Sequence, residues 1–281
     1  AMVLGAGRGP LVAAALRAAR RAEAAVAVWA VEKNPNAVHA LRHRQRTEEG
    51  WGCVEIVAQD MRFWQAPRQA DVIISELLGS FGDNELSPEC LDGAQRFLAE
   101  GGACIPQSYR SSLAPVSCAA LWAEARGRSG SSETGGDPAH LEMAYVVKLH
   151  RAFYPASGPK DCFEYRHPNT ALESNDRHGD FAFEAEADAL VHGFAGYFDA
   201  ELYGGARISI HPARASEGMF SWFPMFFPLQ EPVFLRRGET IRIHLWRRHD
   251  ARKVWYEWAL SEPVATPIQN PSGRSWPIGL L

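Results

Sequence analysis

A glycine-rich turn near the start of the chain constrains its fold more than any other feature of the 281 residues. The apolar run Met2–Leu4 leads into glycines at positions 5, 7 and 9, and an Ala/Leu/Arg-rich stretch extends from Leu11 to about Glu23. This order predicts a strand, a loop and a helix. Glycines allow a ligand to approach the backbone closely, and a helix start offers free N–H groups, so the turn is a candidate ligand site.

The glycine spacing separates two classes of nucleotide site. A dinucleotide fingerprint, G-x-G-x-x-G, needs glycine or alanine where Pro10 stands, whereas proline suits the first turn of a helix. The motif therefore favours S-adenosylmethionine (SAM) over NAD. A glycine turn with a purely structural role is the alternative.

Four candidate site positions each follow a buried run of strand length. Gly5 follows Met2–Leu4, and the others are Glu32 after 25–31, Asp60 after 54–57 and Glu76 after 70–74. Apolar runs separated by helical segments predict a parallel sheet, and ligands bind such sheets beyond the carboxyl ends of the strands. We therefore expect an α/β Rossmann-like domain over residues 1–105.

The texture changes after Pro106, where short alternating runs are separated by turn residues. This predicts an all-β domain over residues 106–281, in which Thr240–Trp246 and Lys253–Trp258 form a hairpin. The Gly/Ser-rich stretch 127–139 is expected to be an inserted loop or arm. Three tryptophans of the alternating strands are expected in the β core: Trp246, Trp255 and Trp258.

Composition excludes several classes of protein. The net charge of −4 argues against a nucleic-acid footprint, and no apolar stretch is long enough for a membrane span. Five scattered cysteines without a C-x-x-C pair indicate reduced thiols of an intracellular protein. Because the first strand is expected to begin at residue 2, we expect a fragment whose N-terminal part is missing.

Glu32 and Asp60 are candidate contacts to a bound nucleoside. A carboxylate at the end of the second strand can accept hydrogen bonds from both ribose hydroxyls, with pairing to Lys33 as the alternative. Asp60 can accept from an adenine amino group while Met61 packs against the ring. The alternative for Asp60 is a helix N-cap.

Two glutamates carry the sharpest functional signal. Glu76 and Glu85 lie nine residues apart and flank Gly79 and Gly82, so a tight loop can bring both carboxylates to one point. Two such carboxylates repel each other and need a cation, and a planar guanidinium matches them bidentately. Apolar residues within the loop indicate partial burial. No His or further Asp has the spacing of a metal site.

These motifs and their flanks resemble the type II, symmetric-dimethylating branch of the protein arginine methyltransferases over essentially the whole chain. The type I enzymes carry Thr-His-Trp where this chain has Phe220-Ser221-Trp222-Phe223. The matching stretches are V-L-G-A-G-R-G-P at 3–10, A-V-E-K-N-P-N-A at 30–37, D-M-R at 60–62, S-E-L-L-G-S-F at 75–81, D-N-E-L-S-P-E-C-L-D-G-A-Q at 83–95, H-G-F-A-G-Y-F at 192–198, G-M-F-S-W-F-P at 218–224 and K-V-W-Y-E-W-A at 253–259.

The resemblance implies a SAM-binding Rossmann-like domain followed by a β-barrel domain for substrate binding and dimerisation. It implies that Glu76 and Glu85 grip the substrate guanidinium and that Trp222 and Phe223 line the substrate pocket. The implied cofactor contacts are Gly5, Gly7, Glu32, Asp60 and Met61. The implied reaction is SAM-dependent methylation of arginine in histones and Gly/Arg-rich RNA-binding proteins, giving mono- and symmetric dimethylarginine.

The family also implies homo-oligomers and a cytoplasmic and nuclear location, with a role in chromatin regulation. Its helices before the first glycine strand, and its N-terminal barrel that binds a WD40-repeat partner, have no match in this chain. We therefore expect that partner not to bind. Two alternative functions stay open: methylation of a small cationic molecule, and a truncated non-catalytic relative that acts as an interaction module.

Overall fold

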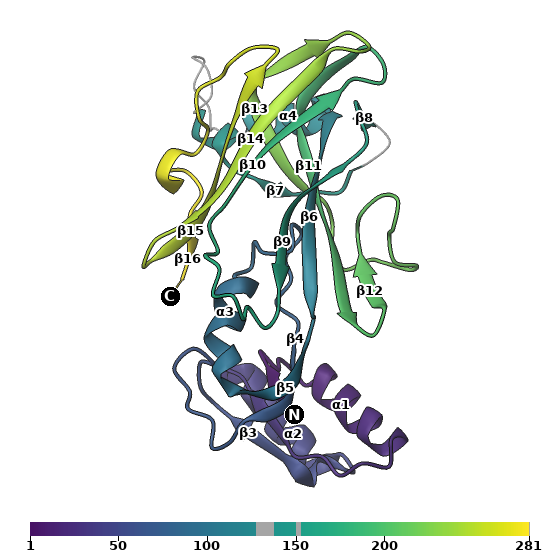
Figure 1. Cartoon of the computed structure of the whole chain (residues 1–281), viewed down its shortest axis with the longest axis vertical. Helices are drawn as coiled ribbons and strands as arrows, with labels where there is room; N and C mark the ends of the chain where they lie inside the picture. Colours follow the sequence, from purple (N-terminus) through teal and green to yellow (C-terminus); the bar gives the residue numbers. More distant parts are fainter. Residues whose placement is uncertain (128–137, 150–152, 281) are drawn as a thin grey trace.

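The computed structural model describes residues 1–127, 138–149 and 153–280, which form two domains along the long axis of the molecule (Figure 1). The first domain contains a parallel five-stranded sheet, which confirms the expected α/β architecture. Its strands, in spatial order, are β3 (Val54–Val57), β2 (Val28–Val31), β1 (Met2–Leu4), β4 (Ala70–Ser75) and β5 (Leu98–Ile105).

Helices pack on both faces of this sheet. Pro10 begins α1 directly after Gly9, as the sequence predicts, and the Asn34 side chain caps the next helix by accepting the N–H of Asn36 at 3.0 Å. Two separate clusters of buried side chains fill the two faces. The helical elements are α1 (Pro10–Arg21), α2 (Pro35–Thr47), η1 (Trp51–Cys53), α3 (Ser87–Ala94) and η2 (Gln95–Phe97).

The second domain is antiparallel and is built from two sheets. The smaller sheet has the order β10 (Arg177–Glu184), β14 (Thr240–His249), β15 (Lys253–Glu262) and β16 (Ile278–Gly279). The larger sheet has the order β7 (Tyr145–Val146), β13 (Met225–Leu235), β11 (Ala189–Tyr203), β6 (Ser108–Ser117) and β8 (Tyr154–Pro155); β12 (Ala206–Ser209) pairs with β11 and β9 (Lys160–Arg166) with β6. Strands β14 and β15 form the predicted hairpin.

The second domain is a β domain, as the sequence predicts, and its described residues also include three short helical elements that the sequence analysis did not name. Helix α4 (Ala119–Gly127) follows β6, and the 3-10 helices η3 (Pro138–Glu142) and η4 (Pro271–Gly273) lie later in the chain. Residues 119–127 are rich in alanine, and the indole N–H of Trp122 donates to the Leu229 carbonyl at 2.6 Å, which fixes the helix on β13. Most of the loop expected at 127–139 lies outside the described residues.

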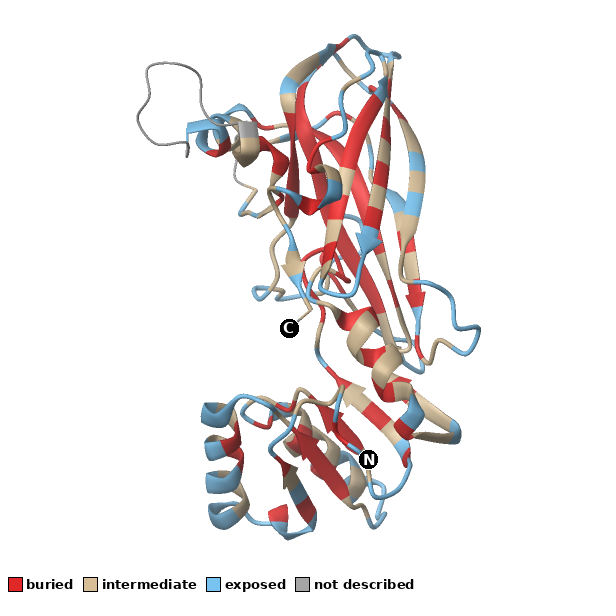
Figure 2. Ribbon diagram, turned by 90° about the vertical axis from the view of Figure 1, so that its left-hand side faces the viewer, coloured by how far each residue is buried: buried red, intermediate tan, exposed pale blue. Residues whose placement is uncertain are grey.

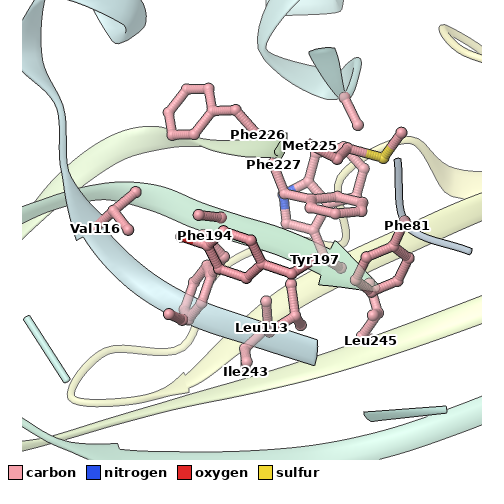
Figure 3. Close-up of a cluster of buried hydrophobic side chains, with 14 of the residues drawn as sticks. Phe81, Leu113, Val116, Phe194, Tyr197, Met225, Phe226, Phe227, Ile243 and Leu245 are labelled. Carbon is pink, nitrogen blue, oxygen red and sulfur yellow. The ribbon is translucent and has the colours of Figure 1, made fainter. Parts of the chain in front are cut away.

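The two sheets share one core. Figure 3 shows Phe194 and Tyr197 of β11 converging with Leu113 of β6 and with Ile243 and Leu245 of β14. Figure 2 shows that buried residues follow the strands of both domains, whereas the helices expose their outer faces. The common core explains how two antiparallel sheets form one domain.

Of the three tryptophans expected in this core, only Trp258 lies there, completely buried. Trp246 follows Leu245 along β14 and therefore points to the opposite face, where its ring stacks on His178 at 4.9 Å between centroids. Trp255 is partly exposed, and its indole N–H donates to Glu257 at 2.8 Å. Strand alternation thus corrects the prediction for two of the three.

Candidate active site

A cavity of about 320 Å³ opens beyond the carboxyl ends of the parallel strands. Four of the five predicted cofactor residues line it, together with one of the two glutamates of the predicted loop. Its walls consist of Gly5, Val31, Glu32, Lys33, Gln59, Asp60, Met61, Arg62, Leu77, Glu85, Leu86, Cys90, Gly279 and Leu280. The sheet topology therefore brings the strand-end residues together as the sequence predicts.

The glycine turn leaves space at its centre. Gly5, Gly7 and Gly9 all have positive φ, at 68°, 53° and 89°. A Cβ on Gly7 would have no heavy atom within 4 Å, whereas one on Gly9 would lie 2.7 Å from the Trp51 ring. A side chain at Gly7 would thus meet open space, although Gly7 does not itself line the cavity, and Gly9 allows α1 to pack closely against its neighbours.

Backbone N–H groups hold the carboxylate of Glu32. The N–H of Gly7 donates to Oε2 at 2.8 Å and the N–H of Asn34 donates to Oε1 at 2.7 Å. The alternative pairing with Lys33 was wrong, because the Lys33 ammonium instead lies 3.3 Å from Oδ2 of Asp60. Glu32 therefore joins the glycine turn to the cavity wall with its charge fixed in place.

Asp60 is paired with Arg62, a residue the sequence analysis missed. The Arg62 guanidinium donates to Oδ1 at 3.1 Å and to Oδ2 at 2.7 Å, and these bonds hold the pKa of Asp60 well below its usual range. The N-cap alternative holds only locally: Oδ1 of Asp60 accepts the Arg62 N–H at 3.0 Å, as a capping side chain does, but a turn follows rather than a helix. Asp60 therefore stays ionised in the cavity.

The loop from Glu76 to Glu85, which we call the double-E loop, is closed by its two glycines. Gly79 and Gly82 form an antiparallel bridge through reciprocal N–H···O bonds of 3.1 and 2.8 Å. The Asn84 side chain reinforces it by accepting the N–H of Phe81 at 2.7 Å. Because Glu76 lies three residues before this bridge and Glu85 three residues after it, the bridge returns both glutamates to the open end of the loop.

The negative charge of Glu76 acts on Glu85. Burial raises the pKa of Glu76, and burial together with the negative charge of Glu76 raises the pKa of Glu85. Both side chains keep access to solvent, and Glu85 lines the cavity. The open end of the double-E loop is therefore an anionic site next to the predicted cofactor residues, and its charge suits a cation.

The tip of the double-E loop inserts into the β domain. Phe81 is completely buried and packs edge-on against Phe227 and Tyr256, with ring centroids 5.3 and 5.9 Å apart. Trp222 of the β domain donates its indole N–H to the Leu78 carbonyl at 2.9 Å. Partial burial of the loop, expected from its apolar residues, is thereby explained.

Phe223 is placed differently from its neighbour. It is partly buried, and the Lys148 ammonium lies 4.9 Å from its ring centroid. Trp222 therefore contacts the double-E loop directly, whereas Phe223 packs beside a cation of the β domain. Neither residue lines the cavity itself.

Comparison with known families gives two matches that together cover almost the whole chain. Residues 1–105 match the family described as PRMT5 arginine-N-methyltransferase, and residues 108–278 match the PRMT5 oligomerisation domain. The chain belongs to the PRMT5 family. Protein arginine N-methyltransferase 5 of Xenopus laevis is 52% identical over 99% of this chain, and skb1 of Schizosaccharomyces pombe is 42% identical over 98%.

These PRMT5 relatives are longer than this chain. The matches cover 44% of the Xenopus protein and 47% of the yeast protein, so the chain spans less than half of their length. A solved structure, the Trypanosoma brucei PRMT1 enzyme-prozyme heterotetrameric complex with AdoHcy, shares the fold with a TM-score of 0.78 and 16% identity. That match covers 95% of this chain and 86% of the other.

The cavity of this PRMT5-family chain is also lined by residues that the sequence analysis did not predict as site residues. Lys33 and Arg62 directly follow predicted site residues, so their positions were a usable signal. Gly279 and Leu280 come from the far end of the β domain: the Leu280 carbonyl accepts a hydrogen bond from Arg62, and its N–H donates to the Arg252 carbonyl at 2.8 Å. Only the tertiary fold reveals this contact.

Cys90 lines the same cavity, but burial raises the pKa of its thiol, so it is not an activated thiolate. Among residues 1–127, 138–149 and 153–280, no cluster of three His, Cys, Asp or Glu side chains is arranged to hold a metal ion. Within the same ranges, no helix is long and apolar enough to cross a bilayer.

Proposed function

We propose that this region methylates arginine side chains of proteins with SAM as methyl donor, forming mono- and symmetric dimethylarginine. The observation that carries the proposal is the return of Glu76 and Glu85 to one anionic site beside the cavity. Membership of the PRMT5 family supports the reaction, and the Phe220-Ser221-Trp222-Phe223 sequence supports the symmetric product.

The cavity residues suit SAM. The open space at Gly7 allows close approach to the turn, and Glu32 presents a fixed carboxylate to a ribose. Met61 offers a polarizable surface for the adenine ring, next to the ionised Asp60. The trypanosomal PRMT1 complex, which shares the fold, contains AdoHcy, and this agrees with SAM as the cofactor.

The double-E loop would bind and orient the substrate guanidinium. Free arginine is protonated, with a pKa of about 12.5–13.8, so its nitrogens are poor nucleophiles. Glu76 and Glu85 would hold the planar group, draw its charge toward the nitrogens they contact and leave another nitrogen free to react. SAM, when bound, supplies an electrophilic methyl group. Correct alignment contributes up to about 7–11 kcal/mol in such reactions, and Glu85 would receive the proton released.

The proposed substrates are histones and Gly/Arg-rich RNA-binding proteins, in the cytoplasm and the nucleus. A homo-oligomer is proposed through the β domain, since residues 108–278 match an oligomerisation domain. These assignments rest on family membership.

The decisive experiment incubates the full-length gene product with SAM and a Gly/Arg-rich peptide. Mass spectrometry then resolves mono-, symmetric and asymmetric dimethylarginine. We expect monomethyl and symmetric products. Asymmetric dimethylarginine would overturn the type II assignment. Methylation of a small guanidinium compound supplied in a parallel reaction, without peptide methylation, would support the small-molecule alternative. Absence of saturable SAM binding would favour the non-catalytic module.

A further inference from the structure

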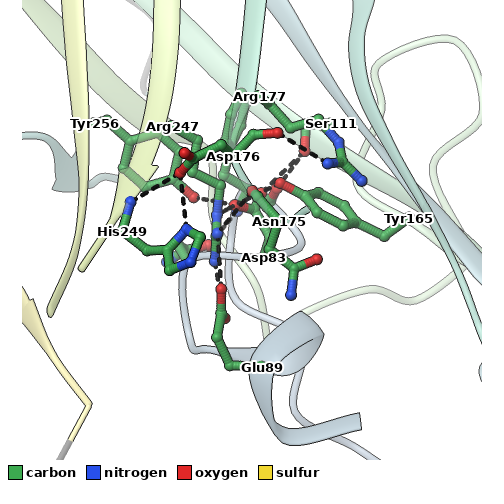
Figure 4. Close-up of polar contacts among 12 residues, drawn as sticks. Asp83, Glu89, Ser111, Tyr165, Asn175, Asp176, Arg177, Arg247, His249 and Tyr256 are labelled. Atoms are coloured by element: carbon green, nitrogen blue, oxygen red, sulfur yellow. Dashed lines mark hydrogen bonds and ion pairs between the residues drawn. The ribbon is translucent and has the colours of Figure 1, made fainter. Parts of the chain in front are cut away.

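A completely buried arginine of the β domain contacts the double-E loop and the helix that follows it. Arg247 of β14 donates through Nε to Oδ2 of Asp83, which lies in the double-E loop and is itself completely buried. Its two Nη groups donate to the two oxygens of Glu89 in α3, at 2.8 and 2.9 Å. Figure 4 shows Arg247 between these two acids.

Further donors fix Asp83 from the β domain. The Tyr256 hydroxyl donates to Oδ2 at 2.5 Å and the Ser111 hydroxyl lies 3.2 Å from Oδ1. The Ser111 hydroxyl also lies 2.7 Å from the Phe81 carbonyl. Side chains of three strands, β6, β14 and β15, therefore all bind the Asp83 carboxylate and fix its position.

The two acids that Arg247 binds flank Glu85 in the sequence. Asp83 lies two residues before Glu85, and Glu89 lies four residues after it. Arg247 therefore holds the chain on both sides of Glu85. Its planar fork fixes direction as well as distance, and a buried guanidinium that loses a partner leaves an uncompensated charge, so the geometry tolerates little displacement.

We propose that Arg247 is a positioning residue that sets the location of Glu85 relative to Glu76 and to the cofactor cavity. This inference rests on the proposed function and deepens it: the β domain places a glutamate of the first domain through one guanidinium. Arg247 does not line the cavity, so its effect is exerted through Asp83 and Glu89.

The test compares two conservative variants of β14 in the full-length gene product. Arg247→Lys keeps the charge but loses the fork, and Arg242→Lys makes the same change at a partly exposed arginine that pairs with Asp180 at 2.9 Å. For Arg247→Lys we expect at least a tenfold lower kcat at saturating peptide and SAM, with SAM affinity within about twofold of wild type. Arg242→Lys should match wild type. Wild-type kcat in folded Arg247→Lys would overturn the proposal.

A second variant covers the case in which Arg247→Lys does not fold. Glu89→Gln keeps the size of the side chain and alters a group that is 14% exposed, so the fold is less affected. It should lower kcat in the same direction without changing SAM affinity. Unchanged kcat in this folded variant would also overturn the proposal.

Hydrogen exchange separates this inference from the proposed function, because it needs no turnover. In either variant, exchange should increase within residues 79–89 while the rest of β14 keeps its protection. Increased exchange confined to this segment in a protein that methylates nothing would retain the positioning role and reject the proposed function. Exchange that increases throughout the protein would show that Arg247 only stabilises the fold through its ion pairs and does not position Glu85.

Discussion

Trp222 of the β domain donates its indole N–H to the backbone carbonyl of Leu78, two residues after Glu76 in the first domain, across 2.9 Å. Its ring also meets Phe198 edge-on at 5.5 Å between centroids. One side chain thus connects the β core to the first half of the double-E loop. The other half is held by Arg247, so the β domain fixes both halves.

Trp222→Phe should lower turnover without weakening SAM binding. The variant keeps an aromatic ring but loses one hydrogen bond, which is worth about 0.5–1.5 kcal/mol and corresponds to a roughly twofold to tenfold decrease in kcat/KM for peptide. Steady-state kinetics and SAM titration calorimetry measure the two effects. An equal loss of SAM affinity would show that the residue acts through the cofactor cavity instead.

Glu76→Gln and Glu85→Gln should each abolish methyl transfer, by at least about 100-fold, because the guanidinium loses a charged partner. SAM binding should stay near normal by calorimetry. Glu55→Gln, at an exposed position of β3, is the matched control and should leave turnover unchanged. Wild-type turnover of Glu85→Gln would falsify the assignment of that residue.

The same two variants should not destabilise the fold. The pKa of each glutamate is raised in the folded state, so the folded protein binds protons more strongly than the unfolded chain. Its stability therefore decreases as pH rises from the ordinary glutamate pKa to the raised one. Removing either charge at pH 7 should therefore raise the free energy of unfolding slightly, by no more than roughly 0.5 kcal/mol because solvent screens these side chains. Denaturant unfolding at pH 7 checks the sign.

Gly7→Ala and Gly9→Ala should separate ligand approach from packing. Alanine at Gly7 has open space, so it costs only the strain of a positive φ, about 1 kcal/mol, while its methyl group obstructs SAM. Alanine at Gly9 adds a collision with Trp51, and overpacking costs a further 1–3 kcal/mol or so. Thermal unfolding should therefore show Gly9→Ala to be the less stable variant. SAM titration should show that Gly7→Ala loses more SAM affinity than its smaller loss of stability accounts for.

Stability should decrease in mild acid because of His167. This side chain is only 7% exposed, and burial lowers its pKa to about 4. In the unfolded chain His167 is protonated below about pH 6.5, whereas in the folded protein it is protonated only below about pH 4. The free energy of unfolding therefore decreases as pH falls from about 6.5 to about 4, by on the order of 2–3 kcal/mol. Neither ring nitrogen has a hydrogen-bond partner among the described residues, so His167→Phe should fold and flatten this pH dependence. Urea unfolding between pH 4 and pH 7 provides the measurement.

Local patterns were sufficient where the signal is local. The apolar runs before Gly5, Glu32, Asp60 and Glu76 predicted the parallel sheet and the edge at which its ligand cavity opens, because strand ends of one polarity meet at one edge. The β14–β15 hairpin followed from alternation. Alternation also predicts that Trp246 lies on the opposite face of β14, because its neighbour Leu245 belongs to the core.

The sequence by itself therefore determined the fold class, the family and the residue types at the cavity, since each depends on short-range order along the chain. The tertiary structure decided which distant groups meet: Arg247 with Asp83, Trp222 with Leu78, and Arg62 with Leu280. A buried charge or a single hydrogen bond has no periodicity, and its partner can lie more than a hundred residues away. Only packing of the two domains brings such partners within bonding distance.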